Sequence, residues 1–192
     1  MAVPTHNSTP GPRAVILVAA GSEEIETIAP ADVLVRAGVD VVLAAVSGMD
    51  VAGSRGLPLR ADRLIGALRG ELFDAIVVPG GTEGARNIAA SPPAQLLIRH
   101  HAETGRLVGS ICAATAVVLG PLGVLDGRRA TGHPGTRAEF PAAATYADEP
   151  TVEDGQLITG RAAAASIEFG LALARRLAGP EAAERVANEM VV

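Results

Sequence analysis

Cys112 is the only cysteine of the 192-residue chain, and it stands in the stretch RLVGSICAAT. An apolar run leads into it, and a run of small residues with a helical pattern follows it. A thiol on a tight strand-to-helix turn is exposed, and the partial positive charge of the helix N-terminus lowers its pKa. Cys112 is therefore a candidate nucleophile. A free cysteine is more commonly a small buried hydrophobic residue, and position alone leaves both interpretations open.

A second apolar run ends in VPGG, with Pro79, Gly80 and Gly81 at its end. Two glycines let backbone N–H groups approach a ligand oxygen closely, which is how an oxyanion hole is made. Gly-Gly is also a common connection between a strand and a helix. The oxyanion interpretation therefore depends on Cys112 lying beside these glycines.

Two further kinds of residue could supply acid or base chemistry. Glu23, Glu24 and Glu26 begin a predicted helix, and we expect two of the three to do no more than offset the helix dipole on a solvated face. A carboxyl pointing into the site would instead lose solvent, retain its proton and hydrogen-bond a thiolate. His133, in the loop TGHPGT, is either a surface residue or the acid or base that a cysteine nucleophile needs.

The elements that must position these residues follow from the apolar pattern. Short, continuously apolar segments predict strands at residues 14–20, 39–46, 74–81 and 106–112. Strands that are apolar on both faces are typical of a parallel sheet covered by helices on both sides. The pattern therefore predicts an α/β doubly wound fold, whose ligands bind beyond the carboxyl ends of the strands.

Helices are predicted between and after these strands, at residues 22–38, 91–105, 161–179 and 180–190. Ser22 is the expected N-cap of the first helix, and Pro30 is expected to bend it or delay its start. His100 and His101 are expected on the polar side of the second helix. Residues 132–160 are expected to form a loop followed by short strands at one edge of the sheet.

Composition excludes several classes of protein. The net charge is −5, the basic residues are scattered and only 2% of residues are aromatic, so we expect no nucleic-acid partner. No apolar run approaches the roughly 20 residues that span a bilayer. One cysteine cannot form an intramolecular disulfide, which favours a reducing, cytoplasmic location. We expect residues 1–12 to be a disordered tail and residues 13–192 to form a single domain.

Several motifs together resemble the DJ-1/PfpI superfamily, in its DJ-1-like branch. They are GSEEIET, SRGLPLRAD, VVPGGTEGARN, SICAA, TGHP and LITGR, in the expected order over residues 13–192. The resemblance implies a flavodoxin-like, three-layer sandwich with a mainly parallel sheet, and a homodimer. It implies that Cys112 is the nucleophile, Glu26 the buried protonated glutamate and His133 the catalytic histidine.

The resemblance also implies the rest of the site: oxyanion N–H groups from Gly81 and Ala113, beside Gly80, with Arg55 and a partner subunit's Arg36 at the border of the pocket. The implied activity is a glutathione-independent glyoxalase that converts methylglyoxal or glyoxal, small α-oxoaldehydes, to lactate or glycolate without metal or organic cofactor. Deglycase activity is a further implied possibility.

Two other functions stay open for the same site: a redox-sensing or stress-protective protein that works by oxidation of Cys112, and a pathway-specific hydrolase or hydratase. Retention of His133 favours the enzyme, because oxidation requires only an accessible thiol of low pKa. The chain departs from many relatives at Ala113–Thr115, where they have Gly or Ala followed by Pro, and in TGRAAAA, which replaces a turn containing glycine and proline. Both departures bear on the substrate rather than on the three catalytic positions.

Overall fold

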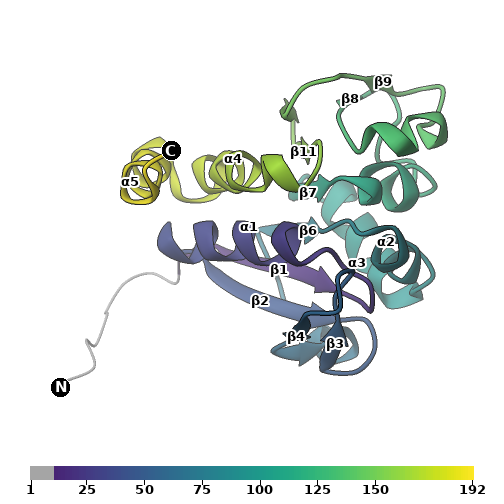
Figure 1. Ribbon diagram of the computed structural model, residues 1–192, viewed down its shortest axis with the longest axis horizontal. Coiled ribbons are helices and arrows are strands. Elements are labelled where there is room, and N and C mark those ends of the chain that lie inside the picture. The colour runs from purple at the N-terminus through teal and green to yellow at the C-terminus, as the bar shows by residue number, and fades with distance from the viewer. Residues whose placement is uncertain (1–10) are drawn as a thin grey trace.

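The computed structural model describes residues 11–192, so the tail predicted for residues 1–12 lies almost entirely outside the described residues. One sheet of seven strands runs through the molecule in the order β10-β11-β7-β6-β1-β2-β5 (Figure 1). Its strands are β1 Arg13–Val18, β2 Asp40–Ala45, β5 Arg63–Leu64, β6 Ala75–Val78, β7 Leu107–Ile111, β10 Thr151–Asp154 and β11 Leu157–Gly160. All neighbouring pairs are parallel except β10 and β11. The four strands expected from apolar runs are β1, β2, β6 and β7.

Two small two-stranded sheets lie outside the central sheet, and the sequence pattern predicted neither of them. β3 (Asp50–Ala52) and β4 (Pro58–Arg60) form an antiparallel hairpin, and β8 (Arg129–Ala130) pairs with β9 (Thr145–Tyr146) in parallel. The predicted strands at one edge of the sheet are β11 and β10.

Helices cover both faces of the central sheet. They are α1 Glu24–Arg36, α2 Thr82–Ala89, α3 Pro92–Glu103, α4 Ser166–Ala178 and α5 Pro180–Met190, with short helical turns at Ile65–Leu68, Thr115–Leu119, Pro134–Glu139 and Ala163–Ala165. Crossovers between parallel strands are right-handed. The crossovers through α1 and α3 step in opposite directions along the sheet, so they place these helices on opposite faces. α4 packs beside α1 (Figure 1). The result is the predicted flavodoxin-like three-layer sandwich.

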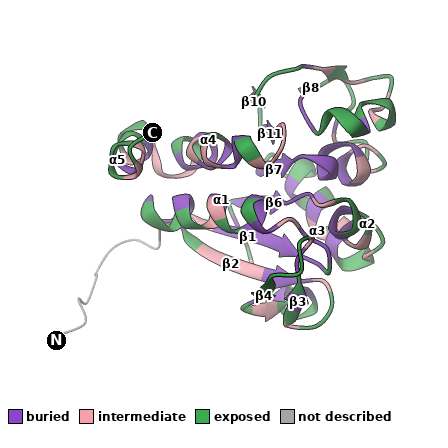
Figure 2. Ribbon diagram, in the orientation of Figure 1, coloured by how far each residue is buried: buried purple, intermediate pink, exposed green. Residues whose placement is uncertain are grey.

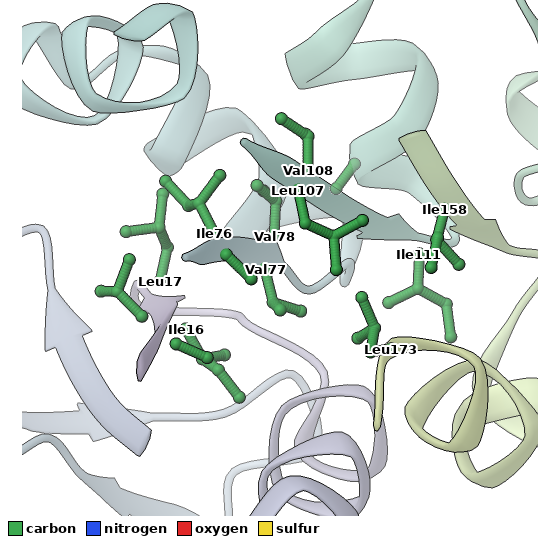
Figure 3. Close-up of a cluster of buried hydrophobic side chains, with 14 of the residues drawn as sticks. Ile16, Leu17, Ile76, Val77, Val78, Leu107, Val108, Ile111, Ile158 and Leu173 are labelled. Atoms are coloured by element: carbon green, nitrogen blue, oxygen red, sulfur yellow. The ribbon is translucent and has the colours of Figure 1, made fainter. Parts of the chain in front are cut away.

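The core is built from aliphatic side chains of the central strands. β6 and β7 are buried along their whole length (Figure 2). Their side chains meet those of β1, β11 and α4, including Leu173 (Figure 3). A Cβ atom on Gly109 of β7 would lie 3.0 Å from Leu173 Cδ2 and 3.1 Å from Phe169 Cζ, so this glycine lets α4 pack closely on the sheet. No helix in the described part of the chain is long and apolar enough to cross a membrane.

Two local predictions were wrong, and so was one alternative of a third. Ser22 does not cap α1, because its hydroxyl accepts from the N–H of Ala19 at 3.0 Å; Glu23 is the cap, and its carboxylate accepts from the N–H of Glu26 at 2.8 Å. α1 continues through Pro30, so the delayed start does not occur, and the alternative of a bend at Pro30 stays a prediction. His101 is 1% exposed rather than on the polar side of α3, and its Nδ1 bonds to Leu97 O at 2.8 Å.

The last long helix also begins later than predicted. α4 starts at Ser166, while residues 161–165 are an extended segment and a helical turn. The alanine-rich composition of this segment concealed the boundary, because alanine is the best helix former and gives no stop signal. The segment is part of the wall of the candidate site.

Candidate active site

Cys112 follows β7 directly and is 8% exposed. Its φ angle is 62°, in the left-handed region that residues other than glycine rarely adopt. Its N–H donates to Gly160 O at 2.9 Å, and its carbonyl accepts from the N–H of His133 at 3.1 Å. Such backbone strain, held by surrounding hydrogen bonds, is typical of a nucleophile on a strand-to-helix turn.

Glu26 is the glutamate that points into the site. It is 1% exposed, and its Oε2 accepts from the N–H of Gly80 at 2.9 Å. The carboxyl also interacts with the Cys112 thiol and with the backbone N–H of Ala163. Burial raises the pKa of Glu26 from 4.5 to about 7, and the negative charge of Glu23 adds to the increase. Glu26 therefore holds or exchanges a proton near neutral pH.

The Cys112 thiol differs from the prediction of a lowered pKa. Burial raises its pKa to about 12, and the charge of Glu26 and its hydrogen bond act in the same direction. The N–H groups of Ala113 and Gly81 lower the pKa but do not outweigh these effects. Two of the three raising causes depend on Glu26 being ionised. The thiolate is therefore stabilised when Glu26 carries the proton, so the pair works as a unit.

Gly80 and Gly81 leave no room for side chains. A Cβ on Gly80 would lie 2.5 Å from Glu26 Oε2 and 2.7 Å from Cys112 Cβ. Gly81 has φ 81°, and a Cβ there would lie 2.2 Å from Gly21 O. Gly81 stands at the N-cap of α2, as in a strand-to-helix connection, and its N–H also interacts with the Cys112 thiol. The N–H of Gly80 donates to Glu26 instead. The oxyanion role of these glycines stays a prediction.

His133 lies on the same cavity but is exposed. Its Nδ1 accepts a hydrogen bond from the N–H of Gly135 at 3.1 Å. A backbone N–H can only donate, so the proton of the neutral ring is on Nε2. In this arrangement His133 offers a hydrogen-bond donor, and not a free base, to a bound molecule.

The cavity has a volume of about 520 Å³ and lies where β1, β6 and β7 end. The strand order changes direction at β1, because β2 lies on one side of it and β6 on the other. Doubly wound sheets bind ligands at the carboxyl ends of the strands at such a point. Arg55 lines the cavity as expected, but Arg36 does not line the cavity of its own chain and pairs with Asp32 at 2.8 Å. The cavity is lined by Ala20, Gly21, Glu23, Glu26, Ala52, Gly53, Ser54, Arg55, Gly81, Thr82, Glu83, Cys112, Ala113, His133, Thr136, Ala162 and Ala163.

Sequence reasoning missed the roles of Glu23 and Glu24. Both were candidates for a solvated face, but Glu23 caps α1 and lines the cavity, and Glu24 is 7% exposed. Glu24 accepts hydrogen bonds from the loop between β3 and β4. The only sign of these roles in the sequence was the presence of three acidic residues within four positions. That pattern does not show which part of the structure each carboxylate contacts. Among residues 11–192, no group of three His, Cys, Asp or Glu side chains is placed to hold a metal ion.

Fold and site together define a flavodoxin-like protein with a cysteine on a strained strand-to-helix turn beside a protonatable carboxyl. Residues 12–176 match the DJ-1/PfpI family. The chain is 36% identical to Protein dj-1beta of Drosophila melanogaster, over 93% of this chain and 96% of that protein. The chain belongs to the DJ-1/PfpI family.

Other relatives extend the comparison. Protein DJ-1 homolog A of Arabidopsis thaliana is 37% identical over 94% of this chain, which spans only 46% of that protein's length. The Glutathione-independent glyoxalase DJR-1.2 of Caenorhabditis elegans is 31% identical, over 87% of this chain and 89% of that protein. Oxidized DJ-1 of Toxoplasma gondii superposes with a TM-score of 0.91 at 34% identity, covering 94% of this chain and 98% of that chain.

Proposed function

We propose that the chain is a cysteine-dependent, cofactor-free glyoxalase that converts methylglyoxal to lactate and glyoxal to glycolate. The observation that carries the proposal is the pairing of the Cys112 thiol with a Glu26 carboxyl whose pKa is raised to about 7 by burial. A shared proton between nucleophile and carboxyl is what an isomerisation with several proton transfers requires. The relative named as a glutathione-independent glyoxalase supports the same activity.

In the first step, the thiol proton passes to Glu26 and the thiolate attacks the aldehyde carbon. The carbonyl oxygen becomes an alkoxide near the N–H groups of Gly81 and Ala113, which already face the sulfur. Glu26 returns the proton to this oxygen, giving a neutral hemithioacetal and an ionised carboxylate.

Glu26 then removes the hydrogen on the former aldehyde carbon and delivers it to the neighbouring ketone carbon. The Nε2–H of His133 donates to the ketone oxygen while negative charge develops there in the enediolate. The hydroxyl proton on the former aldehyde oxygen passes to the former ketone oxygen as the C=O of the thioester forms, which gives a thioester of lactate. Water then hydrolyses this thioester and frees the thiol. One methylglyoxal and one water give one lactate, so no external oxidant or reductant takes part.

The proposal is tested by measuring D-lactate and L-lactate from methylglyoxal without glutathione. Cys112→Ala should abolish turnover, and His133→Ala should lower kcat about 100-fold or more, the usual effect of removing a hydrogen-bond donor to a developing oxyanion. His100→Ala is the matched control, because His100 is exposed on α3 and does not line this cavity. A wild-type protein that forms neither lactate nor glycolate, while its thiol still reacts with peroxide, would overturn the proposal.

We also propose that the chain forms a homodimer through the outer side of α1. Ile25, Ile28 and Val35 on this helix are 54%, 44% and 58% exposed, and Leu57 of the neighbouring loop is 59% exposed. A row of exposed aliphatic side chains along one helix is typical of a contact surface. In such a dimer Arg36, in the last turn of α1, would lie at the partner subunit's cavity. A reducing cytoplasmic location suits a catalytic free thiol and completes the proposal.

The dimer is tested by light scattering during gel filtration. Ile28→Glu should convert a wild-type dimer into a monomer. Leu96→Glu, at a 69% exposed leucine on α3, is the matched control and should leave the dimer intact. A monomeric wild-type protein at micromolar concentration would contradict the proposal.

A further inference from the structure

The loop between β3 and β4 forms one side of the mouth of the Cys112 cavity. Its residues Gly53, Ser54 and Arg55 line the cavity together with Ala52 at the end of β3. Two backbone hydrogen bonds fix the start of this loop, from Gly21 N–H to Ala52 O at 2.8 Å and from Ser54 N–H to Ser22 O at 2.9 Å. Beyond Ser54, the loop is held from the α1 side by a side chain.

That side chain is Glu24. Its carboxylate accepts from the N–H of Arg55 at 2.7 Å, from the N–H of Leu57 at 3.3 Å and from the hydroxyl of Ser54 at 3.1 Å. A Cβ on Gly53 would lie 2.3 Å from Glu24 Oε1, so the loop backbone packs against the carboxylate with no room for a side chain at this position. A buried carboxylate is costly unless it is hydrogen-bonded, and here one loop provides all three of these donors.

The loop carries the only cationic lysine or arginine side chain among the cavity-lining residues, Arg55. Within residues 11–192, the salt bridges of the other arginines involve carboxylates elsewhere, and none includes Arg55. The remaining charged groups at the mouth, Glu23 and Glu83, are acidic. Arg55 is therefore the one arginine of this chain's own cavity lining that can favour negative charge at the thiol.

We propose that Glu24 is a positioning residue that clamps loop 53–57 and so holds the Arg55 guanidinium over the Cys112 cavity, where it favours negative charge on the reacting molecule. In the proposed reaction that charge is the enediolate, and a substrate bearing a carboxylate next to its carbonyl would gain in the same way. The inference rests on the proposed function only in taking Cys112 as the reacting group. Its test measures thiol chemistry rather than lactate formation.

The test compares the alkylation rates of Cys112 by iodoacetate and iodoacetamide. Both reagents form an S–CH₂ bond as the thiolate displaces iodide, and they differ chiefly in the negative charge of iodoacetate. Because Cys112 is the only cysteine, the reaction reports on this site alone. The thiolate fraction cancels in the ratio of the two rates, so the ratio measures the electrostatic field at the sulfur.

Arg55→Gln should lower the iodoacetate-to-iodoacetamide ratio about fivefold, the effect of one charge in a partly solvated cavity. Glu24→Gln should lower it by a similar factor, and the double variant should show no further decrease because both changes act through the same guanidinium. If Glu24 acted only through its own negative charge, its removal would raise the ratio. Glu83→Gln is the matched charge control, and it should raise the ratio.

A ratio in Glu24→Gln that equals or exceeds the wild-type value would overturn the proposal. Thermal unfolding shows whether this variant is folded. If it is not, Ser54→Ala decides the question, because it removes one of the three donors to Glu24 and leaves every charge in place. The ratio should then fall by a smaller factor, and an unchanged ratio would refute the clamp.

Discussion

Replacing Glu26 by glutamine should change how the stability of the protein depends on pH. Glu26 is buried, and its pKa rises from 4.5 to about 7 on folding. Between these two pH values the folded chain holds a proton that the unfolded chain has released. Stability from this group is therefore fully present below the ordinary carboxyl pKa and is lost as pH rises towards 7. Glutamine has no proton to release, so this contribution to the pH dependence disappears.

The size of the effect follows from the shift. An increase in pKa from 4.5 to about 7 corresponds to about 3–4 kcal/mol of unfolding free energy, at about 1.4 kcal/mol for each pH unit. The free energy of unfolding of wild type minus that of Glu26→Gln should therefore fall by about 3 kcal/mol between about pH 4.5 and about pH 7.5. Groups whose pKa values do not depend on Glu26 cancel in this difference.

Urea unfolding at several pH values, followed by circular dichroism, measures this difference. Glu24→Gln is a useful comparison, because the pKa of Glu24 has the opposite shift. Burial alone would raise it, but the hydrogen bonds from the loop, with the N–H of Arg55 first, hold it below its usual value. Stability from Glu24 is thus present above the ordinary carboxyl pKa and lost in acid below it. Parallel pH curves for wild type and Glu26→Gln would refute the assignment of a buried, protonated Glu26.

Three further predictions concern the backbone of the site and its support. Gly80→Ala should cost about 1–3 kcal/mol of stability by overpacking and should inactivate Cys112, because its Cβ would lie 2.5 Å from Glu26 Oε2; full lactate production by the variant would contradict this. The free energy of unfolding of Cys112→Gly should be about 1 kcal/mol larger than that of Cys112→Ala, because glycine adopts φ 62° without strain. Equal stability of the two variants would contradict backbone strain at this position. Ser91→Ala should destabilise the protein by about 1 kcal/mol, because Ser91 Oγ accepts from the N–H of Ala94 at the start of α3. Its turnover should be unchanged, and reduced turnover would show that the cap also shapes the site.

The fold was predictable because its signals are local and strong. Each apolar run became a strand within a few residues, and Ser91 before two prolines marked the start of α3 as expected. The hairpin of β3 and β4 was not predictable, because each of its strands is three residues long and only the middle residue is buried. Two positions of alternation are too few to set a strand apart from a loop.

The candidate site was predictable in its membership but not in its electrostatics. The strand ends brought Cys112, Gly81 and Glu26 to one cavity, as the doubly wound pattern requires. The sequence did not show that burial and Glu26 would together raise the pKa of the thiol. Glu24 was not predictable either, because its donors come from a loop more than 25 residues later in the chain.

The hydrogen bonds of the Cys112 backbone also affect how the protein is made. Gly160 accepts the hydrogen bond from the Cys112 N–H, and His133 donates its N–H to the Cys112 carbonyl. Ala163 donates its N–H to Glu26. All three residues come later in the chain than the cysteine. During synthesis the thiol leaves the ribosome while β11 is still unmade, and at that stage it is an ordinary accessible cysteine. When β11 pairs with β7, the hydrogen bond from the Cys112 N–H to Gly160 O forms. Nascent chains are therefore most open to thiol-modifying electrophiles, including the aldehydes proposed as substrates, before that pairing occurs.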